Sequence, residues 1–200
     1  SDDWVLDRRY RTLNLRGRAR LARELLEEFA AEALAGVPGF HIKKDEDGGS
    51  YWTLAGSPGL LIPVLDIQGR IVALKIRRDE LEVDGGPRYA YLSSSRYGGV
   101  GPGQSVHVPP HEGLSTKVIR LTEGELKADV ATLLSGTMTL GLPGVGAWPL
   151  AAQVLRELGA EEVLVSFDAD ARKKRHVANA LRMAVDSLRA EGFIVKLEVW

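Results

Sequence analysis

The sequence contains no cysteine, and this absence excludes disulfide bonds and thiolate zinc sites within its 200 residues. It also lacks a run of about 18 apolar residues, so no membrane-spanning helix is expected. No basic segment followed by an apolar stretch opens the chain, so no secretory signal is expected either. Together these absences predict a protein of the reducing cytoplasm that does not enter a membrane.

Charge of one sign is not in excess, because 26 basic residues stand beside 27 acidic ones and the net charge is −1. This balance argues against a protein that coats nucleic acid through charge alone. Basic residues nevertheless gather in three places, namely Arg8–Arg20, Lys75–Arg78 and Arg172–Arg175. Such clusters are usually solvated surface, but the third directly follows two aspartates, which favours a phosphate-bearing ligand there.

Aromatic residues are scarce, at 6% of the chain. Those that are present, including Trp52, Tyr89, Tyr91 and Tyr97, are able to stack on nucleic-acid bases. Sparse aromatics on strands usually fill a core, however, and that is the interpretation favoured by the sequence.

Residues 1–113 are predicted to form a smaller α+β subdomain. Leucines at three- and four-residue spacings predict a helix over residues 15–35. A loop rich in glycine, aspartate and lysine is expected to follow through residue 50. Residues 60–77 then alternate around a turn and predict a β-hairpin, with further strands at 88–92 and 106–108.

Residues 114–200 alternate strand and helix patterns, and they are predicted to form a separate α/β domain. Units of this length predict a parallel sheet with right-handed crossovers and helices on both faces. The expected strands cover residues 117–121, 138–142, 162–167 and 193–199, and the expected helices cover 125–134, 150–158 and 177–190.

Three acidic residues follow the expected strands of this second domain. Glu123 comes after the first strand, and Asp168 and Asp170 come after the third. Because ligands bind at the carboxyl ends of parallel strands, these oxygen donors are candidates to hold Mg²⁺ or Mn²⁺. Taken singly, each acid also fits a helix cap or a turn, and it is their combination on one frame that favours a metal site.

The motifs TEGELKADVATLLSG at 122–136, LGLPGVGAW at 140–148 and VLVSFDADARKKRHVANAL at 163–181 resemble the Toprim fold. Bacterial-type primases, phage primase-helicases, topoisomerases and some nucleases share that fold. These sequence motifs are most similar to those of the Toprim-like domain of phage and plasmid replication proteins, which is often joined to helicase modules. The preceding segment, LLIPVLDIQGRIVALKIRRDE with PRYAYLSSS, is similar to the bacterial primase RNA-polymerase core.

The resemblance implies a primase-like nucleotidyltransferase that makes RNA primers during DNA replication of a phage, plasmid or other mobile element. It implies magnesium or manganese bound by Glu123, Asp168 and Asp170, single-stranded DNA template and nucleoside triphosphates as partners, and a helicase domain or subunit. Basic residues become candidates for contacting template or nucleotide, namely Lys75, Arg77, Arg78, Arg88, Arg172, Lys173 and Arg175. A solvated hairpin edge is the other interpretation of the first four.

Two departures from the primase pattern keep other functions open. Lys127 stands where primases carry an acid, and it is placed in the catalytic set as a salt-bridge partner or a phosphate contact, with an exposed helix lysine as the alternative. Arg172 follows Ala171 where primases tend to have glycine. A Toprim nuclease would use the same acids to cut DNA. A module that binds nucleic acid or scaffolds a replication protein would need none of them.

Overall fold

The structure, a computed structural model, describes residues 2–80, 86–167 and 175–198. It divides into two compact units, each with its own hydrophobic core. The first unit comprises residues 1–63 and 73–103, and the second comprises residues 64–72 and 104–200. This division reflects which residues pack together and does not test the domain boundary expected between residues 113 and 114, which stays a prediction.

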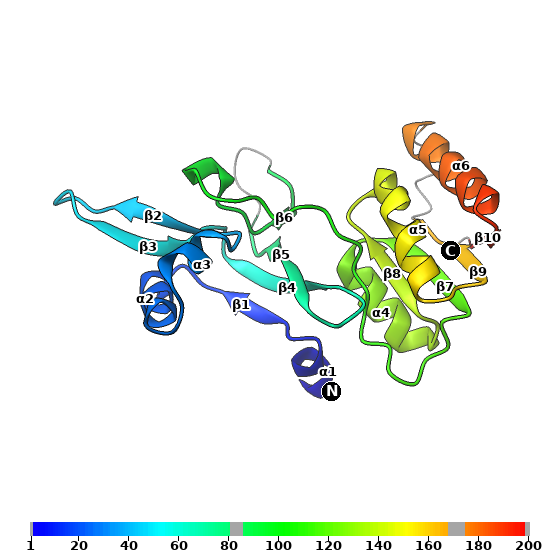
Figure 1. Ribbon diagram of the computed structural model, residues 1–200, viewed down its shortest axis with the longest axis horizontal. Coiled ribbons are helices and arrows are strands. Elements are labelled where there is room, and N and C mark those ends of the chain that lie inside the picture. Colours follow the sequence, from blue (N-terminus) through cyan, green and yellow to red (C-terminus); the bar gives the residue numbers. More distant parts are fainter. Residues whose placement is uncertain (1, 81–85, 168–174, 199–200) are drawn as a thin grey trace. The chain divides into compact units, whose positions relative to one another are not determined.

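The first unit is an α+β structure with two sheets (Figure 1). The larger sheet has the strand order β1-β4-β5-β6, and β2 pairs with β3 as an antiparallel hairpin. Its elements are α1 (Asp2–Asp7), β1 (Arg11–Leu13), α2 (Arg18–Glu28), α3 (Ala31–Ala35), β2 (Phe40–Lys44), β3 (Ser50–Leu54), β4 (Gly59–Leu65), β5 (Ile71–Arg78), β6 (Tyr89–Tyr91) and the 3₁₀ helix η1 (Ser95–Tyr97).

The core of this unit forms where α2 packs against β3. Phe40 pairs with Leu54, and both side chains are buried beside Ala22 of α2. Trp52 packs against the same cluster, because alternate residues of a strand share one face. The opposite face of the β2–β3 hairpin therefore carries His41, Lys43 and their cross-strand partners.

Two predictions for this unit are corrected by the structure. The expected helix over residues 15–35 is two helices, because Phe29 and Ala30 adopt extended backbone angles between them. The expected loop up to residue 50 is instead the β2–β3 hairpin, whose turn includes Gly48 with φ 82°. The hairpin predicted over residues 60–77 is confirmed as β4 and β5.

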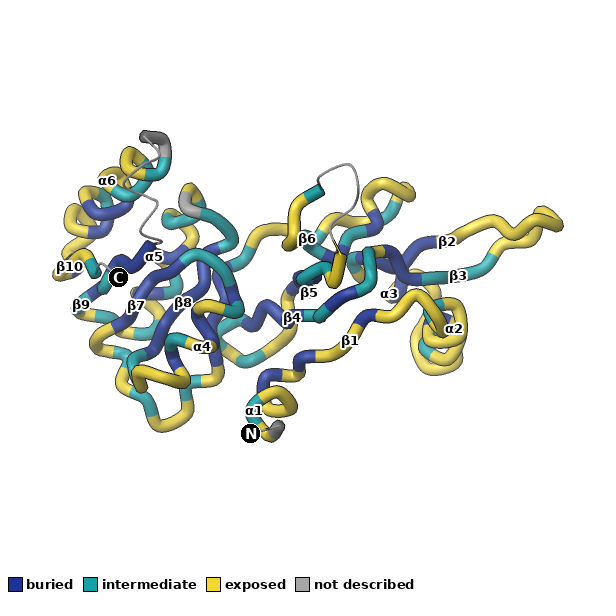
Figure 2. The backbone as a smooth tube through the Cα atoms, turned by 180° about the vertical axis from the view of Figure 1, so that it is seen from behind, coloured by how far each residue is buried: buried dark blue, intermediate teal, exposed yellow. Residues whose placement is uncertain are grey.

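The second unit contains a four-stranded parallel sheet in the order β10-β9-β7-β8. Strands β7 and β8 are buried over most of their length (Figure 2). The elements are β7 (Val118–Glu123), α4 (Glu125–Ser135), β8 (Thr139–Leu142), the 3₁₀ helix η2 (Val145–Ala147), α5 (Trp148–Glu157), β9 (Glu162–Val165), α6 (Arg175–Ala190) and β10 (Ile194–Leu197).

Helices cover both faces of this sheet, as the sequence predicts. On one face Thr132 of α4 bonds to Thr139 of β8. On the other face Leu140 packs in a cluster that includes Leu155 of α5 and Leu188 of α6. The α/β fold class is therefore confirmed, and no described helix is long and apolar enough to cross a bilayer.

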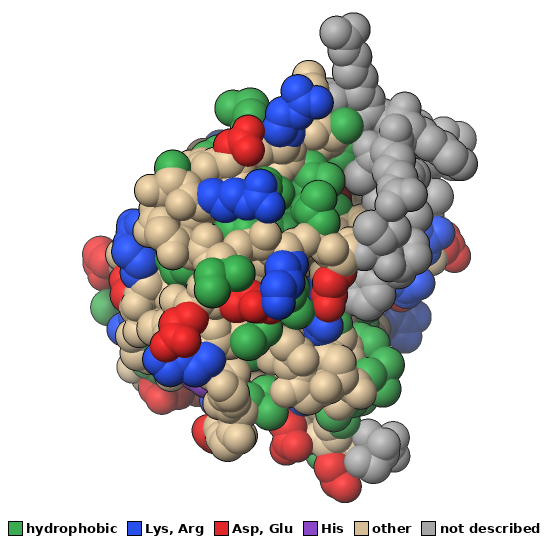
Figure 3. Space-filling model, turned by 90° about the vertical axis from the view of Figure 1, so that its right-hand side faces the viewer, with side chains coloured by type: hydrophobic (Ala, Val, Ile, Leu, Met, Phe, Trp, Pro, Cys, Tyr) green, Lys and Arg blue, Asp and Glu red, His purple; other side chains and the backbone are tan. Residues whose placement is uncertain are grey.

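Acidic and basic side chains are interspersed on the face of the molecule shown in Figure 3. They stand between hydrophobic and other polar groups and form no broad field of one sign in that view. The distribution on this face agrees with the balanced composition of the chain.

Candidate functional site

The end of β7 places Glu123 at the carboxyl edge of the parallel sheet, where its side chain is half-buried. Gly124 follows with φ 91° and begins α4, and its N–H donates to the Leu142 carbonyl at 2.9 Å. Gly141 lets the helix approach, because a Cβ there would lie 3.0 Å from the Gly124 carbonyl oxygen. The glutamate is thus fixed by tight packing of α4 on β8.

Strand β9 runs parallel to β7 and ends at the same edge. Leu121 pairs with Val165, and the Ser166 N–H donates to the Leu121 carbonyl at 2.9 Å. Asp168 and Asp170 follow Phe167 in the chain but lie outside the described residues, as do Arg172 and Lys173. Arg175 begins α6, and its side chain is likewise outside the description.

The convergence of the three carboxylates on a cation therefore stays a prediction. Among the residues that the structure describes, no group of three or more histidine, aspartate or glutamate side chains could hold a metal ion. Glu123 alone of the predicted ligands is described, and its hard oxygen donors at the carboxyl edge of the sheet fit Mg²⁺ or Mn²⁺.

Beneath α4 lies a buried polar group that the sequence analysis did not find. His107 and Asp129 are each 1% exposed, and His107 Nε2 lies 3.3 Å from Asp129 Oδ1. This is close enough for an electrostatic contact, although the N–H is not aligned as in a hydrogen bond. Glu125, one turn before Asp129, is also buried, at 2% exposed.

His107 connects three segments of the second unit. Its backbone exchanges hydrogen bonds with Gly141 at the edge of β8, at 2.8 and 2.9 Å. Its Nδ1 accepts the Leu65 N–H at 3.1 Å, which fixes the neutral tautomer with the proton on Nε2. The histidine therefore holds the segment that precedes β7, the tip of the β4–β5 hairpin and α4 in one arrangement.

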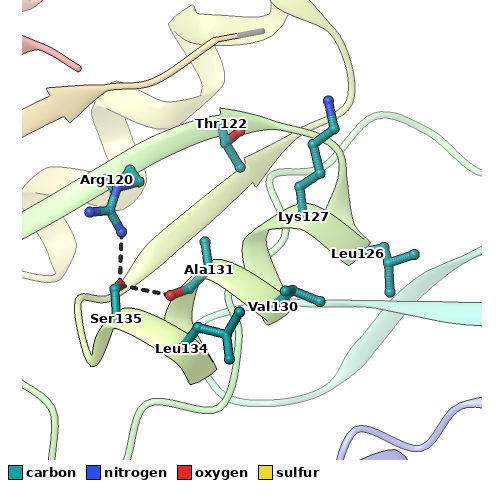
Figure 4. A pocket seen from close by; sticks show the side chains of 8 residues that line it. All are labelled: Arg120, Thr122, Leu126, Lys127, Val130, Ala131, Leu134 and Ser135. Atoms are coloured by element: carbon teal, nitrogen blue, oxygen red, sulfur yellow. Dashed lines mark hydrogen bonds between the residues drawn. The ribbon is translucent and has the colours of Figure 1, made fainter. Parts of the chain in front are cut away.

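A groove of about 650 Å³ runs along the outer side of α4 (Figure 4). Leu126, Val130 and Leu134 follow one another on that side of the helix. Lys127 is exposed near the start of the helix and lines the same groove. The structure places Lys127 four residues after Glu123 on the helix that the glutamate precedes, and its assignment to the catalytic set stays a prediction.

Arg120 closes the inner side of this groove through a network with Glu198. Its Nε and Nη2 donate to the Glu198 carboxylate at 2.5 and 3.1 Å, and Ser166 Oγ bonds to the same carboxylate. The hydrogen bonds from Arg120 outweigh partial burial and hold the pKa of Glu198 below its ordinary value, with Ser166 adding to the effect.

The predicted basic residues of the first unit lie on and beside β5. Lys75 and Arg77 share one face of the strand, where they stand opposite Tyr91 and Tyr89 of β6. Lys75 is buried, with its Nζ 5.0 Å from the centre of the Tyr91 ring. Arg78 points to the other face, and its N–H bonds to the carbonyl of exposed Arg88.

Known structures to which this chain is similar include those of bacterial primases. The Aquifex aeolicus primase, with zinc-binding and RNA polymerase domains, superposes with a TM-score of 0.71 at 16% identity, covering 98% of this chain and 46% of that one. The DnaG primase catalytic domain bound to ssDNA gives 0.69 at 12% identity, covering 100% and 60%. This chain has the fold of a primase RNA polymerase domain.

The Mycobacterium tuberculosis primase RNA polymerase domain in complex with double-stranded DNA gives a TM-score of 0.67 at 17% identity, with 100% of this chain and 62% of that one covered. The chain therefore spans about half to three fifths of the solved chains that it matches. Neither a protein-family model nor the sequence of a curated protein matches it.

Proposed function

We propose that this protein is a primase-like nucleotidyltransferase that joins ribonucleotides on a single-stranded DNA template. The observation that carries the proposal is the position of Glu123. It ends the central strand β7, and β7 pairs with β9, which runs toward Asp168 and Asp170 in the sequence. The primase fold extends over both units and supports the same conclusion.

In this proposal Glu123, Asp168 and Asp170 hold Mg²⁺ or Mn²⁺. The bound ion supplies charge neutralisation for the triphosphate and lowers the pKa of the attacking 3′ hydroxyl. Beside it, Arg172, Lys173 and Arg175 steady the phosphates, since they directly follow the aspartates in the chain.

Lys75, Arg77, Arg78 and Arg88 are assigned to template and nucleotide phosphates. The local structure supports this assignment for Lys75 and Arg77, because the pairing of β5 with β6 sets these two cations opposite Tyr91 and Tyr89. The proposal assigns Toprim chemistry to residues 114–200. It also includes a helicase partner, a role in the replication of a phage, plasmid or other mobile element, and a cytoplasmic location.

Primer synthesis on a single-stranded template with nucleoside triphosphates and Mg²⁺ or Mn²⁺ tests the proposal. Glu123→Gln and Asp168→Asn keep side-chain size and remove charge, and each is expected to reduce synthesis by about two to three orders of magnitude. Glu112→Gln removes an exposed carboxylate of the second unit and serves as the control. Undiminished synthesis by Glu123→Gln would eliminate the assignment.

The exposed position of Lys127 favours a second candidate, a module that binds nucleic acid without chemistry. A cation at this position supplies no metal ligand, whereas it suits a phosphate contact. That candidate predicts DNA binding that persists in Glu123→Gln, together with no synthesis by the wild-type protein. A nuclease is distinguished by cleavage of DNA with metal and without nucleotides.

A further inference from the structure

A polar groove of about 600 Å³ lies wholly within the first unit, away from the residues assigned above. The face of the β2–β3 hairpin opposite the hydrophobic core contributes His41, Lys43 and Tyr51 to the lining of the groove. The first turn of α2 contributes Arg18, and Tyr97 of η1 completes it. The groove thus joins aromatic rings with cationic groups.

Tyr97 is 60% exposed, yet its ring is held in one orientation. It stacks on the buried His41 ring with centroids 4.0 Å apart and planes within 9°. The backbone around it is anchored by buried Ser94, whose Oγ accepts the Gly39 N–H at 3.2 Å and donates to the Val100 carbonyl at 3.2 Å. One face of the ring is therefore occupied by His41 while much of the side chain faces solvent.

Gly99 lets the loop after Tyr97 close on itself. A Cβ at Gly99 would lie 2.4 Å from Ser94 Oγ, so no larger residue fits without displacing this anchor. An exposed aromatic side chain fixed before any ligand arrives is what a base-stacking platform requires, because little rotamer freedom is then lost on binding.

Arg18 lines the same groove and is held by carbonyl groups rather than by a carboxylate. Its Nη1 donates to the Leu54 and Gly56 carbonyls at 3.1 and 2.7 Å, and its Nε donates to the Asn14 carbonyl at 2.6 Å. Its Nη2 has no acceptor among the described residues. Burial lowers the pKa of this guanidinium, as expected for a cation that loses water without gaining an anion.

Other charges around the groove are also cationic. Lys43 and Lys44 are exposed and form no ion pair with the described residues. Helix α2 begins at Gly17 without a side-chain cap or an acid in its first turn, and it carries Arg18 and Arg20 there instead. Cations oppose the positive end of a helix, so this arrangement favours an anionic ligand. The acidic turn at residues 45–47 limits such a ligand to the α2 end of the hairpin.

We propose that this groove binds a segment of single-stranded nucleic acid, with one base stacked on Tyr97, phosphates contacting Lys43, and the Arg18 guanidinium adding positive charge to the wall of the groove. Stacking on an exposed ring requires an unpaired base, and this favours a single strand over a duplex. The proposal deepens the proposed function by adding a second strand contact, apart from the residues of β5 and β6.

Binding of a fluorescent oligonucleotide of about ten nucleotides, measured by anisotropy without metal or nucleotides, tests this site. Tyr97→Ala is expected to weaken binding about tenfold, which is about 1.4 kcal/mol and within the range for one stacked base. Tyr97→Phe keeps the ring and is expected to bind as the wild type does. Phe29→Ala removes another exposed ring of the first unit, one that does not line the groove, and serves as the control.

The phosphate contacts have their own readout. Lys43→Gln is expected to reduce the slope of log affinity against log salt by about 0.7, whereas Arg23→Gln, an exposed arginine outside the groove, leaves the slope unchanged. Circular dichroism checks that each variant is folded.

Wild-type affinity in both Tyr97→Ala and Lys43→Gln would overturn the site, and so would equal affinity for a duplex probe. The outcome is separable from that of the proposed function. Loss of primer synthesis in Glu123→Gln with normal oligonucleotide binding supports both ideas. An inactive wild-type protein that shows the Tyr97 effect refutes the enzyme and keeps the groove.

Discussion

Replacing His107 is the most direct test of how the second unit is held together. The imidazole Nδ1 accepts the N–H of buried Leu65 at 3.1 Å. A buried donor without an acceptor costs about 1–3 kcal/mol. His107→Ala also leaves a cavity beside Asp129, so we expect the free energy of unfolding to fall by about 3 kcal/mol.

Two further substitutions separate the hydrogen bond from packing. His107→Asn sets an amide oxygen where Nδ1 stands, so it keeps the acceptor for Leu65 and is expected to cost about 1 kcal/mol. His107→Leu fills more of the volume but offers no acceptor, and it is expected to cost about 2 kcal/mol.

Urea denaturation followed by circular dichroism measures these differences, with equal slopes required for the comparison. Nitrogen NMR of the folded protein checks the tautomer, because Nδ1 must be the unprotonated nitrogen. If His107→Leu proves as stable as His107→Asn, the hydrogen bond to Leu65 contributes nothing and the reasoning is refuted.

Three other perturbations follow from the structure. Arg120 lowers the pKa of Glu198 in the folded state, so this pair stabilises the fold at neutral pH. That stability is lost as the pH falls below about 4 and the carboxylate takes up a proton. Glu198→Gln should therefore flatten the acidic part of a curve of unfolding free energy against pH. Gly141→Ala should destabilise by about 1–3 kcal/mol in thermal unfolding, because α4 must move, while Gly146→Ala, with open space around it, should not. Gly99→Ala should weaken oligonucleotide binding as Tyr97→Ala does, since it displaces the anchor of that ring.

The second half of the fold could be predicted because its signals are local. The run from Lys117 to Leu121 contains the β-branched pair Val118 and Ile119, and Gly136 ends the helix after it with φ 67°. Each strand and helix there carries its own pattern, so the parallel sheet with helices on both faces could be predicted without tertiary information. The placement of Glu123 at the end of a strand followed from the same pattern.

The β2–β3 hairpin was missed for a physical reason. Its strands alternate, with Phe40, Trp52 and Leu54 directed to the core, but charged residues and glycines between them are also typical of an open loop. Only the packing of α2 on this apolar face decides in favour of strands. Local propensity gives way to tertiary contacts in such a segment.

The buried histidine could not be found from sequence for a different reason. Leu65 and Asp129, the groups that give His107 its role, lie 42 residues before it and on the next helix after it. A histidine that stands between two valines and shortly before two prolines carries no local sign of such partners. For the same reason Tyr97 was interpreted as a core residue, because its stacking partner His41 comes from a strand that the pattern did not indicate.

The interleaved course of the chain limits how this protein can be dissected. Residues 64–72 belong to the same compact body as residues 104–200, although thirty-one residues of the other body separate them. A shortened polypeptide that starts after residue 103 would lack Ile67, which packs against its core. It would also lack Leu65, whose N–H donates a hydrogen bond to His107. Exchange of one body by a single cut in the chain would therefore leave the interior of the second body incomplete.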